Sequence, residues 1–69
     1  MNFIYDPKPL EKARLERGWT KVKVACKVGV HPVAIARVEA GKNQNPRTIL
    51  KMCKILGVKV DAVVIENRE

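Results

Sequence analysis

The stretch from residue 20 to residue 41 constrains this chain most, because it contains two short helical patterns joined by a glycine turn. Thr20 suits the N-cap of the first pattern, and Gly29 can adopt the positive φ that ends it. Pro32 suits the first position of the second pattern, which ends before Gly41. The apolar stripes of the two patterns recur at helical spacing and consist of Val24, Ala25, Val28, Ile35 and Val38. The stretch therefore predicts two short helices that cross closely.

This arrangement is the sequence form of a helix-turn-helix, although other helical hairpins share part of it. The net charge of the chain indicates which kinds of partner it can attract. Lysine and arginine number 14 against 7 aspartates and glutamates, which gives a formal net charge of +7. Such an excess favours a polyanionic partner or an anionic membrane surface. Because the apolar stripes point inward and no aromatic-rich outer face accompanies them, the sequence favours the polyanion and no membrane partner is expected.

Several function classes lack the residues that they need. The chain has no serine, one histidine, two aspartates and no glycine-rich phosphate loop, so the sequence predicts no enzyme. Cys26 and Cys53 lack the spacing of a zinc site or a disulfide framework, so we expect no metal, no cofactor and no small-molecule ligand. Residues 1–9 lack the pattern of a signal peptide, and no segment approaches the roughly 20 apolar residues of a membrane span. A reduced, cytoplasmic setting is expected.

A further helix is predicted ahead of the central unit, from about residue 7 or 9 to residue 17, with Gly18 as its stop. Its inward stripe includes Arg14, and a half-buried guanidinium without a carboxylate would be costly. Glu39, at the end of the second central helix, is the best candidate partner. The sequence therefore predicts a structural ion pair between Arg14 and Glu39. Trp19, the only tryptophan, lies between the first two helices and is predicted to fill the core.

Asn45 and Pro46 form a cap and first-turn pair that opens another helix, which Gly57 closes. The buried stripe of this helix is predicted to be Ile49, Met52, Cys53 and Leu56. No internal repeat, low-complexity segment or domain boundary is visible. We expect one domain over residues 1–69, with a core of about 7–58 and a tail of 59–69.

The tail is the ambiguous part of the chain. Residues 58–65 are rich in valine and isoleucine, which favours an extended tail that pairs with residues 3–5 or with a second subunit. Asp61 could equally cap a last helical turn. Either form leaves apolar surface that so small a domain can cover by dimerising, so a homodimer is expected.

From about residue 10 to residue 60 the chain resembles the phage repressor and Cro family of helix-turn-helix DNA-binding domains, also called the xenobiotic-response-element (XRE) family. The residues that carry the resemblance are Arg14, residues 17–20, Val24-Ala25, Gly29-Val30, residues 35–39, Gly41-Lys42, Asn45-Pro46 and residues 56–58. The resemblance implies an all-α, lambda-repressor-like domain of four to five helices. In that family the second helix lies across the DNA backbone, the third enters the major groove, and residues matching Arg14 and Glu39 form an internal ion pair.

The resemblance also assigns contacts with double-stranded DNA by position. The groove-facing residues would be His31, Pro32, Val33, Ala36 and Arg37. The phosphate-binding residues would be Thr20, Lys21, Lys42, Asn43, Gln44, Asn45 and Arg47. Arg37 can donate two hydrogen bonds to the edge of guanine, which contributes about 1–3 kcal/mol of discrimination. Val33 and Pro32 offer apolar contacts that suit a thymine methyl group.

Three of these residues depart from the family pattern. Lys21 stands where a glutamine is common, so a charge contact replaces the usual amide bridge between phosphate and recognition helix. His31 stands in place of a small hydroxyl cap, and Pro32 in place of a polar base-reading residue. We therefore expect phosphate contacts to supply more of the affinity, and DNA shape more of the specificity.

The leading hypothesis is a sequence-specific, double-stranded DNA-binding transcriptional regulator, a repressor that binds a palindromic operator as a homodimer. Two recognition helices would then meet successive major grooves about 34–36 Å apart. The alternative is an antitoxin-like or accessory interaction module whose main partner is another protein, bound through the tail.

Overall fold

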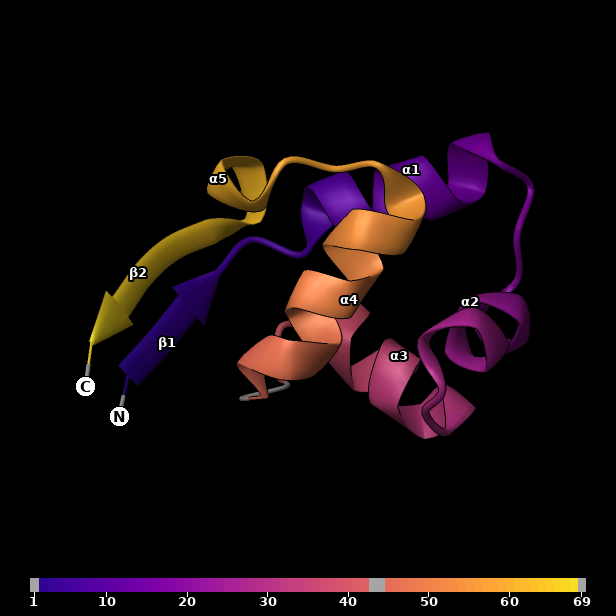
Figure 1. Cartoon of the computed structure of the whole chain (residues 1–69), viewed down its shortest axis with the longest axis horizontal. Coiled ribbons are helices and arrows are strands. Elements are labelled where there is room, and N and C mark those ends of the chain that lie inside the picture. The colour runs from indigo at the N-terminus through magenta and orange to yellow at the C-terminus, as the bar shows by residue number, and fades with distance from the viewer. Residues whose placement is uncertain (1, 43–44, 69) are drawn as a thin grey trace.

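The computed structural model describes residues 2–42 and 45–68, which are mostly helical (Figure 1). In chain order the elements are β1 (Asn2–Tyr5), α1 (Lys8–Glu16), α2 (Lys21–Val28), α3 (Pro32–Glu39), α4 (Pro46–Leu56), α5 (Val60–Val63) and β2 (Val64–Arg68). Within these residues, five helices and one short pair of strands confirm the predicted fold class of a small all-α helix-turn-helix domain. None of these helices has the length and apolar character needed to cross a membrane.

The two central helices form where the sequence predicts them, because each has a side-chain cap. Thr20 Oγ1 accepts a hydrogen bond from the Lys23 amide at 3.1 Å and so caps α2. That helix ends at Gly29, whose φ of 87° lies in the left-handed region that glycine adopts without strain. His31 Nδ1 accepts a hydrogen bond from the Val33 amide at 3.1 Å and caps α3. A ring nitrogen of His31 therefore takes the capping role for which the family resemblance implies a small hydroxyl residue.

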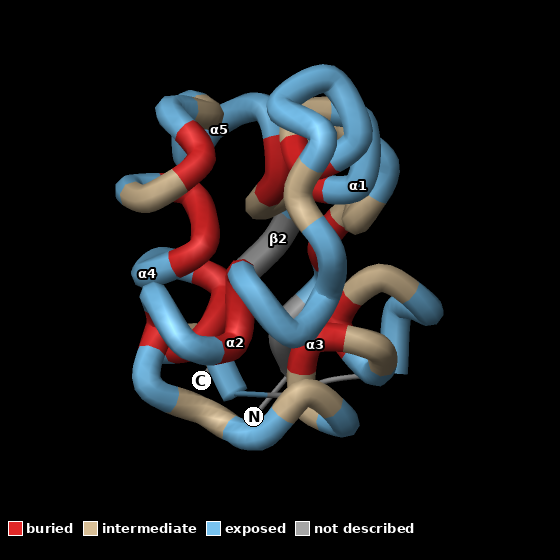
Figure 2. Tube along the Cα trace, turned by 90° about the vertical axis from the view of Figure 1, so that its right-hand side faces the viewer, coloured by how far each residue is buried: buried red, intermediate tan, exposed pale blue. Residues whose placement is uncertain are grey.

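The core lies where α1 to α4 meet, and Figure 2 shows the buried segments of these helices facing inward. Every apolar residue predicted to face inward from α2, α3 and α4 is buried, which confirms the stripes read from the sequence. The largest fully buried side chains are Leu10, Ile35, Ile49, Met52, Val24, Val38, Val63 and Cys53. Since α2 packs against α3 and both pack against neighbouring helices, the core fixes the angle at which α3 reaches the surface.

The two ends of the chain form a small antiparallel ribbon, hereafter the β1–β2 ribbon, at one end of the molecule (Figure 1). The tail is not extended from residue 58, as the sequence favoured, because residues 60–63 form the one-turn helix α5. This turn places Val63 in the core, where it is wholly buried, and its carbonyl accepts a hydrogen bond from the Asp6 amide at 2.7 Å. Pairing with the amino-terminal strand begins at Val64 and confirms the predicted contact between tail and residues 3–5.

The two cysteines differ in exposure, and this difference predicts their reactivity. Cys26 is exposed on α2, whereas Cys53 is buried and desolvation raises the pKa of its thiol. We expect iodoacetamide to modify one thiol per native chain and two in denaturant, as counted by mass spectrometry. Cys26→Ser should abolish the native reaction. Fast alkylation of Cys53 in the native protein would contradict the burial of α4.

Candidate nucleic-acid interface

The outer face of α3 carries the side chains that the sequence assigned to the DNA groove. His31, Val33 and Arg37 are exposed, and Val33 keeps half of its surface accessible. Pro32 and Ala36 are half-buried at the edge of this face. Among the described residues, no hydrogen bond or ion pair occupies the Arg37 guanidinium, which leaves its donors available to a ligand. The helix thus presents one strong donor group beside apolar contact groups.

The predicted phosphate-binding residues lie on both sides of α3 along the chain. Thr20 and Lys21 are exposed at the start of α2, where the first-turn amides and the positive end of the helix dipole also lie. Lys42, after α3, and Arg47, at the start of α4, are both exposed. Asn45 Oδ1 caps α4 by accepting a hydrogen bond from the Arg47 amide at 3.0 Å. The predicted contacts Asn43 and Gln44 lie outside the described residues.

An ion pair connects α1 to the end of α3. Arg14 Nε donates to Glu39 Oε2 at 2.6 Å, and Nη2 donates to Glu39 Oε1 at 3.0 Å. The remaining terminal nitrogen, Nη1, donates to the Trp19 carbonyl at 2.9 Å. The Glu39 side chain is 3% exposed, and the hydrogen bond with it raises the pKa of Arg14. This buried, bidentate pair fixes the carboxyl end of α3 against α1, and with it the direction of the exposed face.

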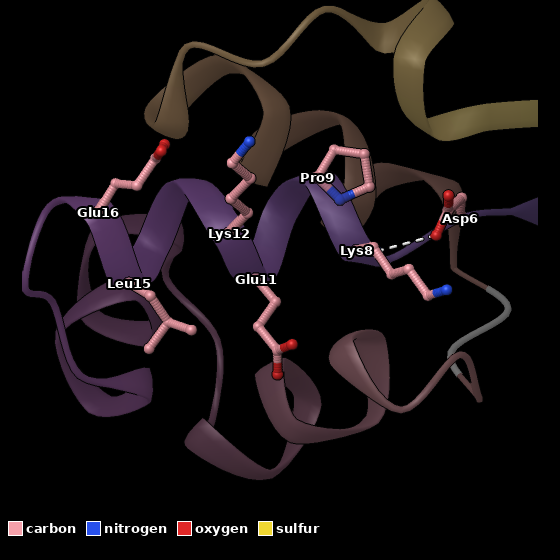
Figure 3. A pocket seen from close by; sticks show the side chains of 7 residues that line it. All are labelled: Asp6, Lys8, Pro9, Glu11, Lys12, Leu15 and Glu16. Atoms are coloured by element: carbon pink, nitrogen blue, oxygen red, sulfur yellow. Dashed lines mark hydrogen bonds between the residues drawn. The ribbon is translucent and has the colours of Figure 1, made fainter.

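Charge is distributed unevenly over the surface. Three acids, Asp6, Glu11 and Glu16, surround a shallow depression on the outside of α1, together with Lys8 and Lys12 (Figure 3). Their side chains spread outward from the helix rather than converging on one point, so they do not form a catalytic or metal-binding arrangement. Among the described residues, no three potential metal ligands gather anywhere.

The central part of the chain is basic in contrast. Between residues 20 and 47 the cationic residues are Lys21, Lys23, Lys27, Arg37, Lys42 and Arg47. Glu39 is the acid of this stretch, and its charge is neutralised by Arg14. Positive charge therefore predominates on α2, α3 and the start of α4, whereas acids and lysines alternate on the outside of α1.

The sequence analysis did not predict a second group of cations, which surrounds the Trp19 ring. Trp19 does not fill the core as predicted, because its ring is half-buried and lies against the core from outside. Arg17, Lys23 and Lys27 place their charges 5.1, 5.5 and 4.9 Å from the ring centroid. In the sequence, the four-residue spacing of Lys23 and Lys27 predicts that the two lysines share one side of a helix. This spacing does not predict that Trp19, which precedes the helix, lies beside them.

Comparison with known proteins agrees with this geometry. A family model described as "Helix-turn-helix" (HTH_3) matches residues 10–63. The fold is similar to the crystal structure of transcriptional regulator VanUg, with a TM-score of 0.68 over 100% of this chain and 92% of that chain. Sequence identity to that protein is 19%, so this similarity bears on the fold. A search of curated proteins found no match. The match over residues 10–63, together with α2 and α3 in place, shows that this chain belongs to the helix-turn-helix family HTH_3, whose members bind DNA.

Proposed function

We propose that this protein is a sequence-specific transcriptional regulator, a repressor that binds a palindromic double-stranded DNA operator as a homodimer. One observation carries the proposal. α3 buries Ile35 and Val38 in the core and turns His31, Val33 and Arg37 toward solvent on the basic side of the molecule. A short helix that is supported from behind and carries an exposed guanidinium is suited to insertion into a major groove.

Base recognition is assigned to the exposed face of α3. Arg37 reads a guanine through two parallel hydrogen bonds, and Val33 contacts a thymine methyl group. His31 has its Nδ1 committed to the Val33 amide, so its other ring nitrogen is available to a phosphate or a base edge. Pro32 and Ala36 pack at the margin of the groove and limit how deeply α3 enters. Because α3 offers one strong donor group, its hydrogen bonds distinguish few base pairs, and DNA shape adds to the specificity.

Phosphate binding is assigned to the two flanks of α3. Lys21, with the Thr20 hydroxyl and the first amides of α2, holds the backbone on one side. On the other side it is held by the residues from the α3–α4 loop to the start of α4, namely Lys42, Asn43, Gln44, Asn45 and Arg47. Contacts on both flanks fix the register of α3 in the groove without reading sequence themselves.

The homodimer contact is assigned to the β1–β2 ribbon. In the described residues the sheet has two strands, so each strand has one edge without a strand partner. Ile4 and Ile65 lie on this ribbon with 46% and 68% of their surfaces exposed. A second copy that covers these side chains and pairs with an open edge would give the two-fold symmetry that a palindromic operator requires.

Ile65→Glu tests the dimer contact. A buried charge at a symmetric interface is repelled by its own copy, so we expect sedimentation to show monomers at concentrations where the unchanged protein is dimeric. Leu15→Glu, at a side chain that is 60% exposed on α1, is the matched control and should stay dimeric. If the dimer instead survives Ile65→Glu and is lost in Leu15→Glu, the contact lies on α1.

Repression follows from occupation of a promoter. A reporter gene with the selected site overlapping its promoter should lose expression when the protein is produced. The same site placed well upstream should leave expression unchanged. Arg37→Ala should relieve the repression. Increased expression from the upstream site would instead identify an activator and would contradict this part of the proposal.

A further inference from the structure

We propose that the Trp19 cluster, defined as Arg17, Trp19, Lys23 and Lys27, is a second DNA-backbone site that binds phosphates beyond the bases read by α3. This inference rests on the proposed function, because it extends the contact with the same duplex. It differs from the assignments above because its four residues belong neither to the proposed groove face nor to the phosphate-binding residues named there.

The cluster brings three cations around one aromatic ring. The Arg17 guanidinium carbon lies 5.1 Å from the Trp19 ring centroid, and the Lys23 and Lys27 Nζ atoms lie 5.5 and 4.9 Å from it. Each distance is within the range in which the negative face of an indole attracts a cation. The ring therefore gathers three positive charges that would otherwise spread into solvent.

The positions of these charges are restrained by the fold. Arg17 Nη2 donates to the Leu56 carbonyl at the end of α4 at 2.8 Å. The Trp19 amide donates to the Arg14 carbonyl at 3.1 Å, so the ring is anchored at its backbone. Lys23 and Lys27 are one turn apart on α2 and share a side of that helix. Binding to a pre-arranged group of cations costs less ordering than binding to mobile lysines.

No acid among the described residues lies at ion-pair distance from the cations of the cluster. Among the described residues, the ion pair within 4.0 Å is that of Arg14 with Glu39, which does not involve Arg17, Lys23 or Lys27. Three like charges around one ring lie within about one Debye length of one another, so they repel at physiological salt. A polyanion removes this repulsion and gains three contacts together.

The position of the cluster favours duplex DNA over an acidic protein. Trp19 immediately precedes Thr20, which caps α2 at the proposed phosphate site, and the Lys23 amide donates to the Thr20 hydroxyl oxygen. The connection from α1 runs along the end of the molecule to α2, away from the β1–β2 ribbon (Figure 1). A DNA strand that passes the start of α2 can therefore continue along the cluster. The charges of duplex DNA repeat every roughly 1.7 Å of helix axis, so adjoining phosphates are always available.

Lys23 and Lys27 lie on a different side of α2 from its buried stripe, which faces the core and α3. The phosphates that they bind must then lie beside the recognised half-site rather than opposite α3. The proposal thus predicts that these lysines matter only when the duplex extends past the bases that α3 reads.

The experiment compares two duplexes that contain the selected operator, one ending at the recognised bases and one extended by about five base pairs at each end. The variant is Lys23→Gln/Lys27→Gln, which keeps Arg17 and its bond to α4. The matched control is Lys51→Gln/Lys54→Gln, which removes the same charge from exposed positions of α4. Binding constants are measured by fluorescence anisotropy across a salt series, and thermal unfolding checks that each variant folds.

The unchanged dimer should bind the extended duplex with a slope of log K against log salt steeper by about 5 than for the short duplex, because two clusters of three cations each add about 0.9 per phosphate contact. The Lys23/Lys27 variant keeps only Arg17 in each cluster, so this difference should fall to about 2. The variant should bind the extended duplex at least roughly tenfold more weakly at low salt, while binding the short duplex unchanged. The Lys51/Lys54 control should behave as the unchanged protein. Trp19 emission should respond to the extended duplex and not to the short one.

Equal slopes for variant and unchanged protein on the extended duplex would overturn the inference, as would an equal loss on both duplexes. These outcomes leave the proposed function standing, because the unchanged protein would still prefer its operator to a scrambled duplex. If the unchanged protein shows no such preference at either length, the proposed function itself fails.

Discussion

Glu39→Ala should lower the unfolding free energy of this protein by about 3–5 kcal/mol at 25 °C. The Glu39 carboxylate is 3% exposed and accepts two hydrogen bonds from Arg14, so its loss leaves a buried guanidinium without a counter-charge. Breaking such a pair costs about 3–5 kcal/mol. A domain of 69 residues has a total stability of roughly 3–10 kcal/mol, so most of its margin would be removed. Urea unfolding followed by circular dichroism measures the loss.

Two further variants distinguish the loss of the ion pair from an unspecific loss of stability. Arg14→Met/Glu39→Leu removes both charges and fills the site with apolar side chains, so it should recover much of the stability lost in Glu39→Ala. Glu16→Ala, at an exposed acid of α1, should change the unfolding free energy by no more than about 0.5 kcal/mol. A Glu39→Ala protein that stays within about 1 kcal/mol of the unchanged chain would refute the role assigned to the pair.

Lys21→Ala/Arg37→Ala should abolish operator binding while leaving the fold intact. Arg37 is proposed to contribute about 1–3 kcal/mol of base discrimination, and Lys21 a phosphate contact. Each loss occurs twice in a dimer, so the combined affinity for the operator should fall at least about a hundredfold. Fluorescence anisotropy with a labelled operator measures it. The single variants should differ, because Arg37→Ala relaxes specificity at one base pair whereas Lys21→Ala weakens binding to all sequences alike.

The control for the Lys21→Ala/Arg37→Ala variant tests whether it still folds. Lys21 is exposed and Arg37 presents its guanidinium to solvent, so thermal unfolding of the double variant should match that of the unchanged protein. Lys51→Ala, an exposed cation on α4, should retain operator binding. Duplex binding that survives in the double variant would show that the site has been placed on the wrong residues.

The helices were predictable because their signals are local. The apolar stripes of α2, α3 and α4 recur at helical spacing, and caps such as Thr20 and Asn45 act on amides two or three residues away. The partner of Arg14 could also be inferred, since a charge on an apolar stripe requires a carboxylate that the fold can bring to it.

The tail depends on contacts that are distant in sequence, and the Trp19 cluster depends on the path of the α1–α2 connection, which places the ring against α2. Valines at 60 and 63 favour a strand locally, but burial of Val63 against the core selects one helical turn before β2 begins. Trp19 meets lysines of the following helix and an arginine held by the Leu56 carbonyl, and no local pattern shows that convergence. For the DNA interface, the sequence indicated which α3 residues are exposed, and the family resemblance indicated the roles proposed for them.

Selection from a random library of duplex DNA tests the central claim most directly. The protein should be used at low and at moderate salt, and the retained sequences aligned. A sequence-specific dimer predicts a palindrome whose half-sites lie about one helical turn apart, retained at both salt concentrations. Retention without any shared sequence, fading steeply as salt rises, would show contacts with phosphates alone and would contradict the assignment of α3 to base recognition.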